Sequence, residues 1–305
     1  MNWKDSISSA AARIEGHAQI TPAMTTAALW ERPVELKLEQ LQHTGSFKAR
    51  GAFNTLLSEP VPEAGVVAAS GGNHGAAVAY AATRLGHRAQ IFVPEMAGPA
   101  KIALIERTGA ALTVVPGEYA NALEAARAYE AETGAMQVHA YDAPGTVAGQ
   151  GTLMREWDEQ GLQADTVLIA VGGGGLIAGS LAWLQGARKV VAVEPETSCA
   201  LHAGLAAGEP VDVQVSGVAA NALGARRVGS ICHELAQAHL GASVLVPDEA
   251  ITEAQTALWQ SHRLLVEPAG ATALAALRSG AYVPEPGERV AVLVCGGNIA
   301  PDPLA

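Results

Sequence analysis

The sequence predicts an α/β fold, built on open and mostly parallel sheet structure flanked by helices. Short runs rich in valine and isoleucine alternate with alanine-rich runs of helical length. Several of the short runs are apolar at every position, as expected of parallel strands that are covered on both faces. Three of the predicted strands end in glycine-rich turns. Strands separated by helices imply right-handed strand–helix–strand units, which build an open sheet.

The expected elements follow one another along most of the chain. Strands are predicted at 65–69, 89–93, 112–115, 136–139, 166–171, 189–193, 243–246 and 289–294. Helices are predicted at 75–86, 99–108, 119–133, 175–186, 248–262 and 268–279, and another helical run opens at Lys48 and continues through Leu57. Pro99 suits the first turn of its helix, where a missing N–H does no harm. Domain boundaries are expected near residues 53 and 141, in segments that cross between structural units.

The composition indicates a folded, acidic protein without a nucleic-acid or membrane partner. Of the 305 residues, 49% are hydrophobic and 16% charged, so a large core can be buried. A net charge of -11 argues against a general binder of the nucleic-acid backbone, which needs a basic face. The N-terminus has no apolar run, and apolar stretches elsewhere are only strand-length, so we expect neither signal peptide nor membrane anchor. The three cysteines are widely spaced, which fits the reducing cytoplasm.

A run of four glycines, Gly172, Gly173, Gly174 and Gly175, lies between a predicted strand and a predicted helix. Such a run leaves bare N–H groups at a helix N-terminus, an arrangement that binds phosphate. A tight turn that packs helix on strand is the structural alternative. The spacing also fits the alanine variant of the dinucleotide fingerprint, with Glu194 placed as the ribose-binding acid, so an NAD-dependent oxidoreductase is the alternative from another class. By itself the loop predicts phosphate binding without identifying the ligand.

Two other turns and one lysine carry chemistry-bearing side chains. The turn from Ser70 through Gly71, Asn73 and His74 to Gly75 offers a hydroxyl, an amide, an imidazole and exposed N–H groups. It suits a carboxylate or a polar ring, although a turn without chemical function reads the same way. Cys295 ends a strand, where a small core residue is the ordinary interpretation. Lys48 follows a small-residue turn and Phe47, in a chain with only five lysines among its 19 basic residues.

Together these segments resemble the serine/threonine dehydratases of the fold type II, tryptophan-synthase-β-like, pyridoxal-phosphate family. The matching motifs, in order, are Thr44-Gly45-Ser46-Phe47-Lys48, Ser70-Gly71-Gly72-Asn73-His74-Gly75, Gly149-Gln150-Gly151-Thr152, the four-glycine loop, Glu267-Pro268-Ala269-Gly270-Ala271 and Cys295-Gly296-Gly297-Asn298. The resemblance covers nearly the whole chain. It implies two open, twisted, mostly parallel sheets with the cofactor in the cleft between domains. Residues 1–52 and 141–305 would form the large cofactor-binding domain, and residues 53–140 a small mobile domain.

The resemblance also implies a role for each matched residue. Lys48 would hold pyridoxal 5'-phosphate as a Schiff base and move protons at the substrate Cα, with Ser70 as the second catalytic residue. The cofactor-binding residues would be Phe47, Lys48, Asn73, Gly172, Gly173, Gly174, Gly175, Glu267 and Cys295. The substrate carboxylate would be held by Ser70, Gly71, Asn73 and His74.

The implied activity is β-elimination from L-threonine, L-serine or both, giving 2-oxobutyrate or pyruvate plus ammonia. Substrate choice stays open, because one methyl group changes affinity by only about 1–3 kcal/mol in an apolar pocket. An alternative substrate is 3-hydroxyaspartate, whose second carboxylate Arg226 and Arg227 could hold unless they are surface charges. A second alternative is serine racemase-like activity. Serine racemases carry a second serine where this chain has Gly71, so we expect racemisation to be weak.

Three further expectations concern metal, assembly and length. Some relatives bind a divalent cation through a glutamate that corresponds to Glu194, but Ser198 and Ala200 occupy the later ligand positions here. One carboxylate is therefore missing from an oxygen-ligand set, and Glu194 stays a candidate ligand of a weak site. The resemblance implies a homodimer that acts on a small amino acid. Because the sequence ends at Ala305, a stand-alone dehydratase without a regulatory domain is expected.

Overall fold

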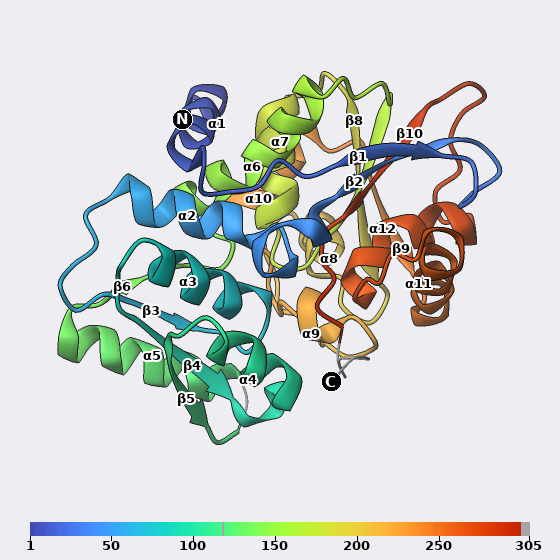
Figure 1. The fold of residues 1–305 in the computed structure, drawn as a ribbon. Coiled ribbons are helices and arrows are strands. Elements are labelled where there is room, and N and C mark those ends of the chain that lie inside the picture. The colour runs from blue at the N-terminus through green and yellow to red at the C-terminus, as the bar shows by residue number, and fades with distance from the viewer. Residues whose placement is uncertain (118, 300–305) are drawn as a thin grey trace.

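The computed structural model describes residues 1–117 and 119–299, and it confirms the α/β fold with two mostly parallel sheets flanked by helices (Figure 1). In the described residues the larger sheet has six strands in the order β1-β2-β10-β7-β8-β9, and the smaller has four in the order β5-β4-β3-β6. Among the strands of the described residues, only β1 runs antiparallel to its neighbour. All other pairings are parallel.

The larger sheet is formed by β1 (Ala23–Thr26), β2 (Val34–Leu38), β7 (Thr166–Ala170), β8 (Lys189–Pro195), β9 (Ala242–Val246) and β10 (Val290–Val294). The smaller sheet is formed by β3 (Val66–Ala69), β4 (Ala89–Pro94), β5 (Ala111–Val115) and β6 (Met136–Gln137). The helices are α1 (Trp3–Ile14), α2 (Lys48–Ser58), α3 (Asn73–Arg84), α4 (Pro99–Glu106), α5 (Tyr119–Thr133), α6 (Pro144–Glu159), α7 (Gly175–Leu184), α8 (Ala200–Ala207), α9 (Ala220–Leu223), α10 (Ser230–His239), α11 (Asp248–His262) and α12 (Pro268–Ser279). Short 3-10 turns occupy Glu39–Leu41, His43–Gly45 and Glu95–Ala97.

Every strand and helix expected from the sequence is present, within two residues at most of its ends. The sequence did not predict β1, β2, α1, α6, α8, α9 or α10. Helix α6 was not predicted because its glycines lower the helix propensity of the segment. A Cβ at Gly149 would lie 2.7 Å from Cα of Gly51 in α2, so these glycines allow the two helix backbones to touch. The glycines of α6 are therefore explained by a tertiary contact, the close packing of α6 on α2.

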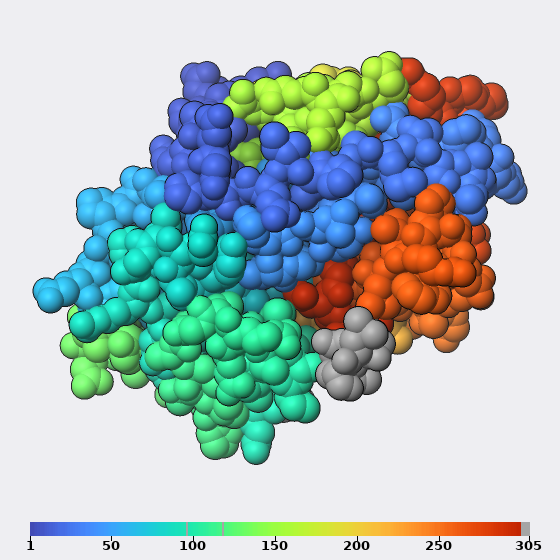
Figure 2. Space-filling view, viewed as in Figure 1, coloured from blue at the N-terminus to red at the C-terminus, as the bar shows by residue number. Residues whose placement is uncertain are grey.

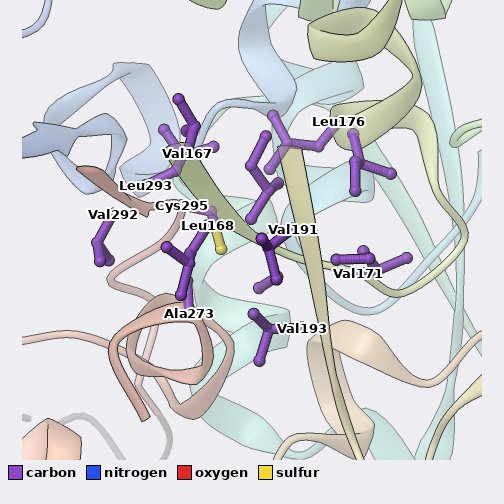
Figure 3. Packing of buried hydrophobic residues seen from close by; sticks show 14 of the residues in the cluster. Val167, Leu168, Val171, Leu176, Val191, Val193, Ala273, Val292, Leu293 and Cys295 are labelled. Atoms are coloured by element: carbon purple, nitrogen blue, oxygen red, sulfur yellow. The ribbon is translucent and has the colours of Figure 1, made fainter. Parts of the chain in front are cut away.

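Each sheet has its own apolar core. The larger core lies around β7, β8 and β10, where Val167, Val191 and Leu293 interdigitate with the side chains of the covering helices (Figure 3). The smaller core packs α2 and α3 against β3 and β4. All strands of the smaller sheet lie between residues 66 and 137. The domain boundaries at 53 and 141 stay a prediction, because residue 53 lies inside the helix α2 that connects the two units.

The same division is visible at the surface. Figure 2 shows the teal and green segments that build the smaller sheet gathered in one part of the molecule, and the orange and red C-terminal segments in another. The N-terminal segments, in dark blue, lie with the larger unit, as the pairing of β1 and β2 within the larger sheet requires.

No helix within the described residues combines the length and the apolar content that a bilayer crossing demands.

A buried group of four charges ties α2 to the larger sheet. Arg50 in α2 binds Glu39 with Nε and Nη2, at 2.9 and 2.7 Å, and it reaches Glu156 of α6 at 2.8 Å with Nη1. Lys37 of β2 pairs with the other oxygen of Glu156 at 2.6 Å. Both cations and Glu39 are at most 2% exposed. Because each buried charge has a partner of opposite sign, the cluster avoids the free-energy cost of burying any one of these charges alone.

Replacing Arg50 by methionine should therefore destabilise the fold strongly, since Glu39 would remain buried without its cation. We expect the Arg50→Met variant to lose about 3–5 kcal/mol in the free energy of unfolding, measured by urea denaturation. The matched control is Arg289→Met, which breaks an exposed arginine–aspartate pair with Asp165 and should change stability little. An Arg50→Met variant as stable as this control would contradict the assignment.

Candidate active site

The lysine segment is joined directly to the third glycine turn. Ser46 forms an isolated antiparallel bridge with Gly296, and the Phe47 N–H donates to the carbonyl of Cys295 at 3.3 Å. The Gly297 N–H donates to the Gly45 carbonyl at 2.9 Å. These backbone contacts place the start of α2 at the carboxyl end of β10. Parallel sheets present ligand sites at this edge.

One pocket gathers every residue that the sequence predicted to bind the cofactor. It is lined by Phe47, Lys48, Asn73, Ala170, Gly172, Gly173, Gly174, Gly175, Leu176, Ala222, Leu223, Glu267, Ala269 and Cys295. Ser70, Gly71 and His74 are not in its wall: Ser70 and Gly71 lie in the adjoining turn, and His74 lies in the first turn of α3. A larger open groove of about 640 Å³ beside Trp30 and Arg278 contains none of the predicted site residues.

The four-glycine loop is packed so closely that side chains are excluded. A Cβ at Gly173 would lie 2.3 Å from the ring of Tyr141, and one at Gly174 would lie 2.4 Å from Sγ of Cys232. Gly174 also has φ +95°, a conformation that favours glycine. The loop leads directly into α7, whose first N–H groups have no partner within the helix. Bare N–H groups at a helix N-terminus form the geometry that binds phosphate.

Lys48 begins α2 and lies beside the ring of Phe47, with Nζ 5.2 Å from the ring centroid. Its Nζ donates a 2.7 Å hydrogen bond to the carbonyl of Ala140. Burial lowers the pKa of Lys48 to about 8, although the nearby carboxyl of Glu267 acts in the opposite direction. An amine with this pKa is neutral far more often than an ordinary lysine, as nucleophilic chemistry at a carbonyl requires.

Asn73 and Glu267 form another part of the pocket wall. The Asn73 side-chain amide donates to Glu267 at 2.5 Å and accepts from the amide of Asn298 at 2.8 Å. Burial raises the pKa of Glu267 to about 7, partly opposed by this hydrogen bond and by the charges of two lysines. Asn298 also donates to the carbonyl of Thr44, so it links three turns.

Cys295 lies at the end of β10, among the apolar side chains of the larger core (Figure 3). Its thiol donates to the carbonyl of Ala269 at 3.3 Å. Burial raises the pKa of this thiol well above its usual range, so it stays protonated and uncharged. A neutral thiol can face a ring nitrogen without fixing a proton on it.

The Ser70 turn is held by local hydrogen bonds. The Ser70 hydroxyl accepts from the Gly72 N–H at 3.2 Å. His74 is buried, and its Nε2 donates to the carbonyl of Val138 at 2.8 Å. Burial, together with the charge of Lys48, lowers the pKa of His74 to about 3, so this imidazole is neutral. The roles of Ser70, Gly71 and His74 in binding substrate stay predictions.

Glu194 lies outside the pocket. Its two oxygens accept the backbone N–H groups of Leu201 and His202, at 2.8 and 2.7 Å, at the start of α8. Burial raises its pKa to about 7. This geometry gives Glu194 a helix-capping role. Within residues 1–117 and 119–299, no group of three His, Cys, Asp or Glu side chains is arranged to hold a metal, and a weak cation site at Glu194 stays a prediction.

Four participants were not predicted from the sequence. The Ala140 carbonyl and Tyr141 come from the segment after β6, which shows no motif. Asn298 lies within the third turn and could have been named from it. Lys101 of α4 is buried, donates to the Asn221 carbonyl and acts electrostatically on Glu267, and its sequence signal was the scarcity of lysine.

The residues present fit pyridoxal 5'-phosphate. The group needs a phosphate cradle, an amine that can be neutral and a neutral partner for its ring nitrogen. The close-packed glycines at the start of α7, Lys48 and the Cys295 thiol supply these in one pocket. Asn73 supplies a side-chain amide between them.

The comparisons with known proteins agree with this fit. A family model described as "Pyridoxal-phosphate dependent enzyme" matches residues 13–296. Phenylserine dehydratase of Ralstonia pickettii is 37% identical, over 94% of this chain and 90% of its own. The structure of a threonine deaminase from T.th. matches with a TM-score of 0.90 and 34% identity, over 98% of this chain and 99% of its own. The structure of maize serine racemase matches with a TM-score of 0.92 and 28% identity, over 99% of this chain and 95% of the racemase chain. The chain therefore belongs to the family of pyridoxal-phosphate dependent enzymes, and it has the two-sheet fold of the serine/threonine dehydratases.

Proposed function

We propose that the chain catalyses β-elimination from a β-hydroxy-α-amino acid such as L-threonine or L-serine. The observation that carries the proposal is Lys48, a lysine with a lowered pKa in the same pocket as the glycine loop and the Asn73–Glu267 pair. The names of the three similar proteins support this substrate class, because threonine, serine and phenylserine all carry a β-hydroxyl group.

The cofactor, when bound, supplies an electron sink for the charge that develops at Cα. Lys48 would hold the cofactor and take the Cα proton, for which its amine must be neutral. Asn73 and Glu267 would orient the ring, and the glycine loop would hold the phosphate. The proton taken from Cα and the hydroxyl lost from Cβ together make one water, and one water is consumed again when the amino nitrogen is released as ammonia. The net products are one 2-oxo acid and one ammonia.

The choice of substrate within this class is a finer proposal. Threonine and serine are our first candidates, and phenylserine is added by the similarity to the Ralstonia pickettii enzyme. The case for 3-hydroxyaspartate is weaker, because the Arg227 guanidinium that could hold its second carboxylate is exposed and already engaged. It donates to the Pro210 carbonyl and lies 3.6 Å from Asp212. The homodimer and the cytoplasmic location stay predictions.

Replacing Lys48 by alanine should abolish turnover, because the residue proposed to hold the cofactor and move the Cα proton is lost. We expect oxo-acid formation from L-threonine, L-serine and phenylserine to fall at least ~10³-fold, with the oxo acid measured as its hydrazone. The control, Lys189→Ala, removes an exposed lysine and should retain full activity. Full activity in Lys48→Ala would sink the proposal.

Uptake of the cofactor by the cofactor-free protein should depend on pH through Lys48. Its neutral form reacts with the aldehyde, and burial lowers its pKa to about 8, so the rate should rise with pH and level off above about 8. Below that pH the rate should fall about tenfold for each pH unit. Stopped-flow absorbance of the bound cofactor measures this rate. A midpoint near the ordinary lysine value, about 10.4, would show that burial does not act on Lys48 as we infer.

The serine racemase alternative meets a packing obstacle at Gly71. A Cβ placed there would lie 2.3 Å from Cβ of Ala97 and 2.9 Å from Cγ1 of Val93. Contacts this short are not tolerated in a packed core, and overpacking costs about 1–3 kcal/mol. The chain therefore lacks both the second serine and the space for it.

Two variants test this obstacle. Gly71→Ser alone should unfold at a lower temperature than the wild type and form little D-serine from L-serine. Adding Ala97→Gly should recover part of the stability, because the shorter of the two clashes is removed, and should raise D-serine formation. Thermal unfolding and chiral chromatography measure the two effects. A single Gly71→Ser variant with wild-type stability would contradict the packing argument.

A further inference from the structure

The segment from residue 139 to residue 142 contacts both halves of the pocket. It lies between β6 and α6, and its Ala140 carbonyl accepts the 2.7 Å hydrogen bond from Nζ of Lys48. A neutral lysine amine has two N–H groups and one lone pair. Because one N–H is held by this carbonyl, the directions open to the lone pair are restricted, which orients the amine for attack on an aldehyde. The 139–142 segment therefore sets the orientation of the reactive amine.

The same segment supports the phosphate loop. Tyr141 packs so closely on the loop that a Cβ at Gly173 would lie 2.3 Å from its ring, and one at Gly175 would lie 2.9 Å from its Cα. A loop backed in this way keeps its N–H groups in place before a phosphate arrives, which lowers the ordering cost of binding. Ala140 and Tyr141 are neighbours in the chain, so whatever fixes this segment acts on the amine and on the loop.

His139 fixes the segment through a ring nitrogen. Its Nδ1 accepts the backbone N–H of Tyr141 at 3.3 Å and that of Asp142 at 2.9 Å. Within the described residues, neither N–H donates to a backbone carbonyl. The His139 carbonyl accepts from the Thr146 hydroxyl at 2.9 Å, which ties the start of the segment to α6. One imidazole nitrogen therefore satisfies two backbone donors that would otherwise lack a protein partner.

This arrangement requires a neutral imidazole with its proton on Nε2, because a protonated Nδ1 would point a donor at two other donors. Partial burial lowers the pKa of His139. The charges of Lys48 and Arg127 act in the same direction, and the carboxylate of Asp142 opposes them. The ring is therefore neutral at pH 7, as the two hydrogen bonds to Nδ1 demand.

Asp142 anchors the far end of the segment. Its carboxylate accepts the Ile231 N–H at 3.0 Å and the Ser230 hydroxyl at 2.9 Å, at the start of α10. Just before that helix, the Gly229 N–H donates to the carbonyl of Gly173 in the phosphate loop at 3.1 Å. Both ends of the segment are thus held, and the conformation between them depends on the contacts of the imidazole.

We infer that His139 is a positioning residue, whose Nδ1 holds the 139–142 segment so that Ala140 faces the Lys48 amine and Tyr141 backs the phosphate loop. A side chain outside the pocket wall then governs both halves of the cofactor site. The inference rests on the fit of the cofactor and not on the reaction proposed above.

Two substitutions at residue 139 separate the acceptor from the ring. His139→Asn places an acceptor oxygen one bond from Cγ, where Nδ1 stands, and asparagine readily accepts a backbone N–H two residues further on. His139→Phe keeps a ring, in a position where the imidazole centroid lies 5.1 Å from that of Tyr141, but removes the acceptor. The side chain at residue 139 is exposed, so neither substitution leaves an internal cavity.

The cofactor-free protein is tested with two ligands that each use one half of the site. Pyridoxine 5'-phosphate carries the phosphate but no aldehyde, so its affinity, measured by calorimetry, reports on the glycine loop. Pyridoxal carries the aldehyde but no phosphate, so its rate of reaction with Lys48, followed by absorbance, reports on the amine.

In His139→Phe we expect the affinity for pyridoxine 5'-phosphate and the rate with pyridoxal both to fall about threefold to thirtyfold, the scale of one or two lost hydrogen bonds. In His139→Asn both should stay within about twofold of the wild type, because the acceptor is retained.

Two further variants serve as controls. His139→Gln, whose acceptor lies one bond further from the backbone, should behave like His139→Phe. If His139→Phe weakened the whole fold, seen as early thermal unfolding, the comparison with His139→Asn would use His139→Gln instead. His262→Phe makes the same substitution at the end of α11, outside the pocket wall, and should change neither measurement.

Three outcomes would overturn the inference. If His139→Phe and His139→Gln matched the wild type with both ligands, the contacts of Nδ1 would not hold the site. If His139→Asn lost as much as His139→Phe, the ring and not the acceptor would be responsible. A loss confined to one ligand would contradict the coupling of the two halves. None of these measurements uses an amino acid, so a chain that forms no oxo acid from any β-hydroxy amino acid would refute the proposed function and leave this inference standing.

Discussion

The pairing of Arg50 with Glu39 fastens helix α2 to the end of strand β2 in the larger sheet. Glu39 directly follows β2, and Arg50 lies two residues after Lys48, so the bidentate contact fixes the lysine segment against a strand of the larger sheet. Glu156 and Lys37 complete the charge balance from α6 and β2. The same helix then leads into the smaller sheet. This cluster lies outside the pocket wall, yet it orients the helix that carries Lys48, as supporting contacts do in many preorganised sites.

One wall of the pocket, the four-glycine loop, has no room for side chains. Tyr141 and Cys232 pack against the glycine loop so closely that any Cβ would collide with them. The close packing by Tyr141 and Cys232 requires residues without side chains, and the same positions would present bare N–H groups to a phosphate. Around this loop the titratable groups are shifted toward neutrality, namely Lys48, His74, Glu267 and Cys295. A pocket with few fixed charges suits a cofactor that brings its own.

Periodicity and glycine position were enough to predict parallel strands that alternate with helices and three glycine turns at the sheet edge, whereas the two sheets and the residues that line the pocket were implied by the family resemblance. Periodicity and glycine position are both local signals, because a short apolar run followed by glycines indicates by itself a strand that ends at the edge of the sheet where ligands bind. What could not be predicted depends on distant partners. Strand β2 reads as polar because Lys37 is charged, and it is a buried strand only because Glu156 neutralises that charge. The glycines of α6 read as helix breakers until α2 is seen against them. The position of Lys101 likewise depends on α9, which lies 120 residues further along the chain.

The contact between Gly71 and Ala97 also limits how this chain could change its chemistry over time. A serine at position 71 meets the methyl group of Ala97, which belongs to a different turn. The effects of changing the two positions are therefore not additive, because they share one contact. A serine at residue 71 would cost less stability once residue 97 is smaller, so the order in which the two positions change matters. Selection acting on one substitution at a time would then keep the enzyme on elimination, and the order of mutations becomes part of its specificity.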